Sequence, residues 1–183
     1  MKARAVVIAV VGSKRSGKTT TVEALVRELS RKGYRVAAIK HISERDFTLD
    51  TKGKDTWRYA QAGARTIIGI SANEMATIER TSKAFTLKDI IERSQSHDIV
   101  FLEGFKKLVN NARHIPKIVT VKSKEEALEA MSTYKPTIAF AGPFPTDKLG
   151  LRTPYADALR NPTKLAGIVE AFMIENGKRR SRQ

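Results

Sequence analysis

The segment that most constrains the fold of this chain runs from Gly12 to Thr19 and reads GSKRSGKT. It follows an apolar, β-branched run over residues 4–11, which is typical of a strand buried on both faces of a parallel sheet. Apolar residues with helical spacing come after it: Val22, Leu25, Val26 and Leu29. The segment therefore predicts a strand, a glycine-bearing turn and the first turn of a helix.

The rest of the chain continues this alternation. Apolar, strand-like runs occupy residues 34–39, 99–102, 117–121 and 137–141, with helical patterns between them. The β-prone segments 64–71 and 75–80 are close enough to form a hairpin. We expect an α/β chain with the three-layer P-loop NTPase fold, whose mostly parallel sheet is extended by this antiparallel hairpin. Residues 1–177 are predicted to form a single domain, and residues 178–183 a basic, disordered tail.

The turn has the chemistry of a phosphate cradle. Backbone N–H groups of a glycine-bearing loop, at the positive end of a helix, can surround a triphosphate. The motif assigns the β- and γ-phosphates to Lys18, Mg²⁺ to the hydroxyl of Thr19, and the α-phosphate side to Thr20. The residues expected to bind nucleotide are Gly12, Ser13, Lys14, Arg15, Ser16, Gly17, Lys18, Thr19 and Thr20.

Other candidate residues follow the predicted strands, because ligands bind at the carboxyl ends of parallel strands. Glu103 ends the run 99–102 in the position of a Walker B acid, where it can bind Mg²⁺ through water or orient an attacking water. Lys40 and His41 end the second strand, and a substrate role and a solvated surface are equally compatible with them. Asp50 and Asp55 come next; a metal-facing role is open for both, and Asp55 also fits a helix N-cap.

Composition narrows the remaining possibilities. The chain carries 34 Lys and Arg against 19 Asp and Glu, a formal net charge of +15, which favours anionic partners. It contains no cysteine, which excludes disulfides, thiolate metal sites and a cysteine nucleophile. No apolar run is long enough to span a membrane, so we expect a cytoplasmic protein.

A set of landmarks resembles one family. They are the P-loop, Lys40-His41, Gly53-Lys54-Asp55-Thr56, Ala62-Gly63-Ala64, Glu103-Gly104-Phe105-Lys106 and Pro116-Lys117. Together they are similar to the molybdopterin-guanine dinucleotide biosynthesis protein B family, MobB. The landmarks cover residues 9 to about 121; the P-loop alone is generic, whereas the combination is specific.

The resemblance implies a GTP-binding accessory protein with weak GTPase activity. Such a protein assists a molybdenum cofactor guanylyltransferase that attaches GMP to molybdopterin, forming the guanine dinucleotide of the molybdenum or tungsten cofactor. It also implies a homodimer with an extended sheet. Lys18 and Glu103 would be catalytic, Thr19 and Glu103 would bind Mg²⁺, and an adjoining surface for anionic ligands would include Lys40, Asp55, Lys106 and Lys117.

Two departures from the family pattern leave alternatives. Ile42-Ser43-Glu44 stands where many members carry further histidines, and no Asn/Thr-Lys-x-Asp guanine signature is present. GTP preference therefore rests on the resemblance. A small-molecule kinase, with residues 106–114 closing as a lid, is the second hypothesis. A nucleic-acid-binding NTPase is the third, and nucleic acid is not the expected partner because no aromatic residues are interleaved with the basic tail.

Overall fold

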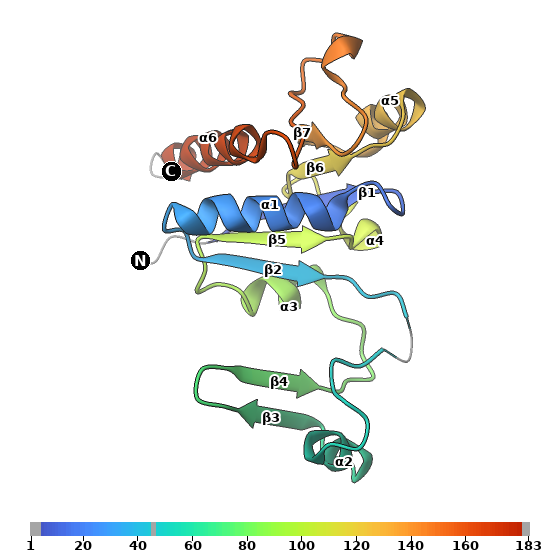
Figure 1. Ribbon diagram of the computed structural model, residues 1–183, viewed down its shortest axis with the longest axis vertical. Helices are drawn as coiled ribbons and strands as arrows, with labels where there is room; N and C mark the ends of the chain where they lie inside the picture. The colour runs from blue at the N-terminus through green and yellow to red at the C-terminus, as the bar shows by residue number, and fades with distance from the viewer. Residues whose placement is uncertain (1–4, 45–46, 181–183) are drawn as a thin grey trace. The chain divides into compact units, whose positions relative to one another are not determined.

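The computed structural model describes residues 5–44 and 47–180 of the chain (Figure 1). The chain divides into two compact units. We call Met1–His41 with Thr86–Gln183 the P-loop unit and Ile42–Phe85 the hairpin unit. The sequence predicted a single domain over residues 1–177, a span that includes the whole hairpin unit and the P-loop unit up to residue 177.

The P-loop unit is built on a five-stranded parallel sheet with the order β2-β5-β1-β6-β7. The strands are β1 (Val6–Gly12), β2 (Val36–Lys40), β5 (Ile99–Glu103), β6 (Lys117–Thr120) and β7 (Thr137–Ala141). The central strand β1 has β5 on one side and β6 on the other, with Val10 paired to Glu103 and Gly12 paired to Thr120. The ends of β5 and β6 therefore lie on either side of the turn that follows Gly12.

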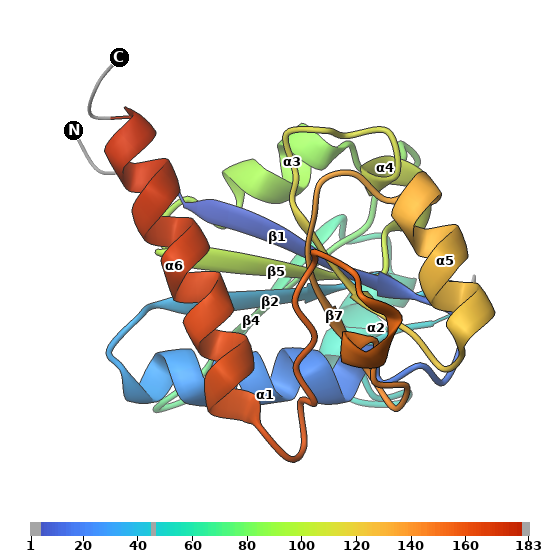
Figure 2. The same ribbon diagram turned by 90° about the horizontal axis from the view of Figure 1, so that it is seen from above.

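Helices cover both faces of this sheet (Figure 2). One face packs against α1 (Lys18–Arg31) and α6 (Pro162–Arg180), the other against α3 (Leu87–Glu92), α4 (Lys106–Val109) and α5 (Lys124–Thr133). Successive β1 residues alternate between the two cores: Ile8 packs with the α1 and α6 side, Ala9 with the α3, α4 and α5 side. Burying a side chain such as Leu25 stabilises the fold by about 1.5–3 kcal/mol.

The hairpin unit contains α2 (Asp55–Gln61), β3 (Thr66–Ile70) and β4 (Met75–Glu79). The two strands are antiparallel, with Ile68 opposite Thr77 and Ile70 opposite Met75. Ile67 is buried, whereas Ile68 on the other face is exposed.

The predicted fold class is confirmed in its main features: a parallel sheet between helical layers and an antiparallel hairpin. The attachment of the hairpin differs from the prediction. Among the described residues β3 and β4 pair with each other in a separate two-stranded sheet, so the hairpin does not extend the main sheet within one chain. Sequence periodicity predicts strands but does not reveal which edges they pair with.

The C-terminal end also differs. Helix α6 continues to Arg180, so the backbone of residues 178–180 is helical rather than a tail, and residues 181–183 lie outside the described residues. No helix in the described part of the chain is long and apolar enough to cross a membrane.

Candidate functional site

The turn between β1 and α1 is held in a shape that requires glycine at its first position. Gly12 has φ +152°, and a Cβ there would overlap the carbonyl oxygen and the hydroxyl of Thr120. Gly17 has φ +90° and forms the N-cap of α1. Arg15 also has a positive φ, 60°, which is uncommon outside glycine and is found where a loop is shaped by its surroundings. The loop thus curls back over the end of β1.

The start of α1 is open to an anion. No side chain caps this end of the helix, and its first turn contains no acidic residue. The N–H groups of Lys18, Thr19 and Thr20 have no partner within the helix by its geometry. Unsatisfied N–H groups and the positive end of the helix dipole favour a bound phosphate here.

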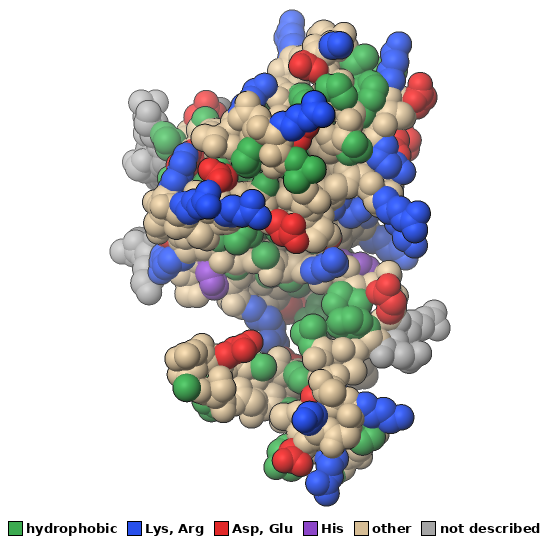
Figure 3. All heavy atoms as spheres, viewed as in Figure 1, with side chains coloured by type: hydrophobic (Ala, Val, Ile, Leu, Met, Phe, Trp, Pro, Cys, Tyr) green, Lys and Arg blue, Asp and Glu red, His purple; other side chains and the backbone are tan. Residues whose placement is uncertain are grey.

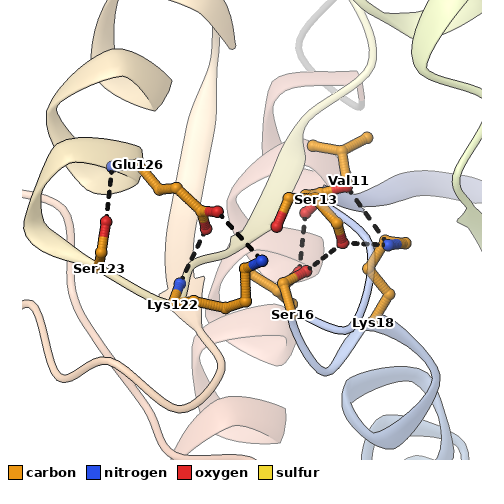
Figure 4. Close-up of polar contacts among 9 residues, drawn as sticks. Val11, Ser13, Ser16, Lys18, Lys122, Ser123 and Glu126 are labelled. Carbon is orange, nitrogen blue, oxygen red and sulfur yellow. Dashed lines mark hydrogen bonds and ion pairs between the residues drawn. The ribbon is translucent and has the colours of Figure 1, made fainter.

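Lys18 lies inside the loop. Its Nζ donates to the carbonyl oxygens of Ser13, at 2.6 Å, and Gly12, at 3.3 Å (Figure 4). Burial lowers the pKa of Lys18 below its ordinary value, the Glu103 carboxylate opposes this change, and the charges of Lys40 and Lys122 add to the lowering. The ammonium group is therefore held by the loop at the place where the motif requires it.

Thr19 and Glu103 meet at the mouth of the cradle. The Thr19 hydroxyl donates to Oε1 of Glu103 at 2.8 Å, and Lys40 Nζ lies 3.5 Å from the same oxygen. Glu103 is almost fully buried at the end of β5, and Lys40 is its register neighbour on β2. Hydroxyl and carboxylate oxygens are the hard ligands that Mg²⁺ prefers, directly or through water. This pair fits the metal site that the sequence predicted.

Two residues that the sequence did not single out support the cradle from β6 and β7. The hydroxyls of Ser16 and Thr120 share a hydrogen bond at 2.6 Å, and Thr120 Oγ1 also donates to Val11 O at 3.1 Å. Gly142 has φ +98°, and a Cβ there would lie 2.7 Å from the carbonyl oxygen of Ser16. Thr120 ends β6 and Gly142 directly follows β7, and this position at the carboxyl end of a strand is the signal that could have identified them.

The structure brings together some of the predicted site residues and separates others. Lys14 and Arg15 are exposed on the loop. Lys106 begins α4, with its Nζ 5.7 Å from the centre of the Tyr134 ring. His41 stacks edge-on against Phe105, with ring centres 5.3 Å apart.

The structure corrects the prediction that Lys117 lines a ligand surface. Its side chain is fully buried, and Nζ donates to the carbonyl oxygens of Ala112 and Lys135, at 2.7 and 2.8 Å. Burial lowers the pKa of Lys117. The residue begins β6, whereas the cradle lies beyond the opposite end of that strand. Lys117 thus ties two loops together inside the protein rather than lining a ligand surface.

Asp50 and Asp55 belong to the hairpin unit. Asp50 Oδ1 accepts hydrogen bonds from Thr51 N and from the Thr56 hydroxyl, both at 2.8 Å. Asp55 is the first residue of α2, and its carboxylate lies 3.5 Å from Arg58. The N-cap position is occupied by Lys54, so the N-cap alternative for Asp55 is wrong by one residue.

A parallel sheet, a glycine-bearing loop that opens a helix, an inward lysine and a hydroxyl paired with a strand-ending acid define a P-loop NTPase-class protein. The family model for molybdopterin guanine dinucleotide synthesis protein B, MobB, matches residues 7–142. The chain therefore belongs to the MobB family.

Individual relatives agree with this assignment. A Methanocaldococcus jannaschii protein is 38% identical over 121 residues, which are 65% of this chain and 48% of the relative. A Haemophilus influenzae molybdopterin-guanine dinucleotide biosynthesis adapter protein is 34% identical over 114 residues, 61% of each chain. This chain thus spans about half of the first relative and 61% of the second.

Solved structures extend the similarity to the fold. The crystal structure of Bacillus subtilis MobB superposes with a TM-score of 0.68 and 28% identity, covering 90% of this chain and 96% of that one. Because 90% of this chain is covered, the match extends beyond residue 142, where the family model ends.

Proposed function

We propose that this chain binds GTP with Mg²⁺ in its P-loop cradle and acts as a GTP-binding adapter in molybdopterin guanine dinucleotide synthesis. It would assist a molybdenum cofactor guanylyltransferase that attaches GMP to molybdopterin. The contact between Thr19 and Glu103 carries the proposal, because it joins the metal-binding hydroxyl of the motif to the strand-ending acid within a MobB-family chain. A GTP-dependent role of this kind belongs in the cytoplasm.

Each cradle residue has a distinct part in this proposal. Lys18 exchanges its carbonyl partners for the β- and γ-phosphates, and the N–H groups at the start of α1 surround them. Thr19 and Glu103 would hold Mg²⁺, which neutralises charge on the phosphates when it is bound. Lys40, beside Glu103, adds positive charge to the same mouth.

The arrangement favours slow hydrolysis. Glu103 is engaged by Thr19 and Lys40, and Lys18 is a phosphate ligand, so neither is free to act as a base. P-loop hydrolysis depends chiefly on positioning and charge stabilisation, and a partner often supplies the missing residue. We therefore propose a weak GTPase whose nucleotide state governs its contact with the guanylyltransferase.

The hairpin unit supports a homodimer as part of the proposal. Ile70 and Met75 are cross-strand neighbours, 78% and 68% exposed, and Ile68 lies on the same face. An exposed apolar face on a two-stranded sheet is a common site of association, and a lone hairpin is only marginally stable in water. A second copy of the chain is the proposed occupant of this face.

The two alternatives receive less support. In the loop expected to close as a kinase lid, residues Lys106–Val109 form α4 and Val109 is fully buried. On the face shown in Figure 3, Lys and Arg side chains are scattered among other side chains rather than gathered in one basic patch. A nucleic-acid-binding surface would concentrate them.

A binding titration tests the proposal. GTP and ATP are titrated into the chain with Mg²⁺ or EDTA, with and without the guanylyltransferase, and Lys18→Ala serves as the control that loses binding. The expected result is Mg²⁺-dependent preference for GTP and a transferase interaction that changes with the bound nucleotide. Equal affinity for GTP and ATP together with no transferase contact would overturn it.

A further inference from the structure

A cavity of about 270 Å³ lies at the amino end of β1, where residues Ala5, Val6 and Val7 line it. Figure 2 shows this end of β1 beside the C-terminal half of α6. The cradle follows the other end of the strand, at Gly12, and β1 extends over about 20 Å between the two. The cavity is therefore separate from the proposed nucleotide site.

The cavity lies where hydrogen bonding between β1 and β6 ends. Ala9 is paired with Lys117, the first residue of β6, and the Ala9 N–H donates to Pro116 O at 2.9 Å. Backbone groups two residues apart in a strand point the same way, so the N–H and C=O of Val7 face the same side as those of Ala9. Proline has no N–H to donate to Val7 O, and in the described chain no backbone hydrogen bond joins Val7 N–H to His114 O. Val7 therefore offers one donor and one acceptor to the cavity.

The other lining residues are mostly apolar. Ile91 of α3, Pro116 and Phe172 of α6 form apolar walls, and His114 is exposed among the lining residues. Asn176 adds an amide, whose Nδ2 donates to Phe172 O at 2.8 Å and whose Oδ1 accepts no hydrogen bond from the residues that the structure describes. Lys, Arg, Asp and Glu are absent from the described lining, which favours a neutral occupant.

The backbone groups of Val7 need a partner. Val7 and its neighbours Ala5 and Ile115 are buried, and buried N–H and C=O groups are nearly always hydrogen-bonded because an unpaired one is costly. One water occupies about 30 Å³ of liquid, so the cavity has room for a small organic molecule. Such a molecule can satisfy both groups of Val7 while its remaining surface contacts the apolar walls.

We propose that this cavity binds a small, neutral, mostly apolar molecule whose edge carries an N–H beside a C=O, as in a lactam. The ligand N–H donates to Val7 O, and the ligand C=O accepts from Val7 N–H, so the ligand supplies the partner that the segment before β6 lacks. Its apolar body contacts Ile91 and Phe172. This site goes beyond the proposed GTP binding and does not depend on it.

A pair of probe compounds tests the site. 2-Quinolone is a neutral bicyclic lactam, and N-methyl-2-quinolone is the same molecule without the N–H donor. Each is titrated into the ¹⁵N-labelled chain and followed by NMR. We expect 2-quinolone to shift the Val7 amide signal with a Kd on the order of 0.1 mM, and the N-methyl compound to bind about tenfold more weakly. In the free chain, Val7 N–H should exchange with solvent about tenfold faster than Ala9 N–H, which is bonded to Pro116 O.

A substitution beside Val7 locates the binding site. Ala5 lines the cavity and is 5% exposed, so Ala5→Leu adds side-chain atoms there while the backbone groups of Val7 stay the same. It should weaken 2-quinolone binding about tenfold. Ala158→Leu is the matched control, because Ala158 is 7% exposed in the same unit but outside the lining, and it should bind within about twofold of the unaltered chain. If Ala5→Leu does not fold, the two compounds on the unaltered chain decide.

Several results would overturn the site and leave the proposed function standing. Equal binding of the two compounds would mean that Val7 does not pair with the lactam edge, and binding of neither would assign the gap to water. Slow exchange of Val7 N–H in the free chain would mean that another part of the chain already fills the gap. GTP affinity should be unchanged by 2-quinolone, and competition between the two would place the probe in the cradle instead.

Discussion

The hydroxyl of Thr19, at the start of α1, donates a hydrogen bond of 2.8 Å to Oε1 of Glu103, at the end of β5. The two residues are 84 positions apart in the chain. Their contact links the two halves of the proposed site, the loop that we propose surrounds phosphate and the strand end that we propose faces Mg²⁺. It exists because β5 is the direct neighbour of β1 in the sheet.

Replacing Glu103 with Gln should weaken Mg²⁺-dependent GTP binding. The amide keeps the size of the side chain and can still accept from Thr19, but it loses the negative charge that favours the metal. We expect the affinity gained from Mg²⁺ to fall about tenfold, measured by titration in Mg²⁺ and in EDTA. Glu92→Gln, at an exposed position of α3, is the control. An unchanged Mg²⁺ effect in Glu103→Gln would remove Glu103 from the metal site.

Replacing Gly12 with Ala should destabilise the fold strongly. The added Cβ overlaps the Thr120 carbonyl and hydroxyl, and φ is already positive. We expect the free energy of unfolding in urea to fall by about 3 kcal/mol or more. Gly33→Ala is the control, because Gly33 has φ +86° with no atom within 4 Å of the new Cβ. Its cost should be about 1 kcal/mol, and equal costs at the two positions would refute the crowding at Gly12.

Replacing Asp98 with Asn should make stability less dependent on acid pH. The Arg35 side chain and backbone N–H hold the pKa of Asp98 at about 2, against an ordinary value of 3.8. A depressed carboxyl pKa adds stability above the ordinary value, which is lost as the pH falls through about 2. Because the pair is largely exposed, Asn should cost about 0.5 kcal/mol at neutral pH. Urea unfolding from neutral pH to about pH 2 should show this difference vanish. A constant difference would contradict the assignment.

Replacing Ile70 with Asp should disrupt the proposed homodimer. The new carboxylate would lie on the exposed face that includes Ile70. Association of two copies would bury it without a cation to pair with, which is unfavourable. Sedimentation velocity should show a dimer for the unaltered chain and a monomer for this variant. Leu159→Asp is the matched control, since Leu159 is also 78% exposed but lies in the P-loop unit. Loss of the dimer in both variants, or in neither, would argue against the hairpin face.

Replacing Lys117 with Met should leave GTP affinity within about twofold of the unaltered chain. The Lys117 ammonium binds the carbonyls of Ala112 and Lys135 in the interior, so it contributes to folding rather than to a ligand surface. GTP titration measures the effect, with the thermal unfolding midpoint recorded alongside. A tenfold loss of affinity without a change in stability would restore the ligand role that the family resemblance implied.

Local patterns in the sequence determined the central part of this protein. The apolar run before Gly12, the glycine-bearing turn and the spacing of Val22, Leu25 and Leu29 predicted β1, the turn after it and α1 correctly. They suffice because a buried strand, a φ-constrained turn and an amphipathic helix each depend on neighbours within a few residues. The position of Glu103 at the end of a strand was predicted in the same way, from the apolar run that precedes it.

The tertiary structure alone decided which distant residues meet. The hydroxyls of Thr120 and Ser16, which are 104 positions apart in the chain, form a hydrogen bond. The Lys117 side chain is buried in the interior, and the Lys122 side chain points toward the loop of the cradle. The hairpin likewise pairs with itself and not with the main sheet in the described chain. These outcomes depend on strand order, register and burial, which arise from the packing of the whole P-loop unit or hairpin unit. No local pattern contains them, because residues of the same type and spacing are compatible with several strand orders.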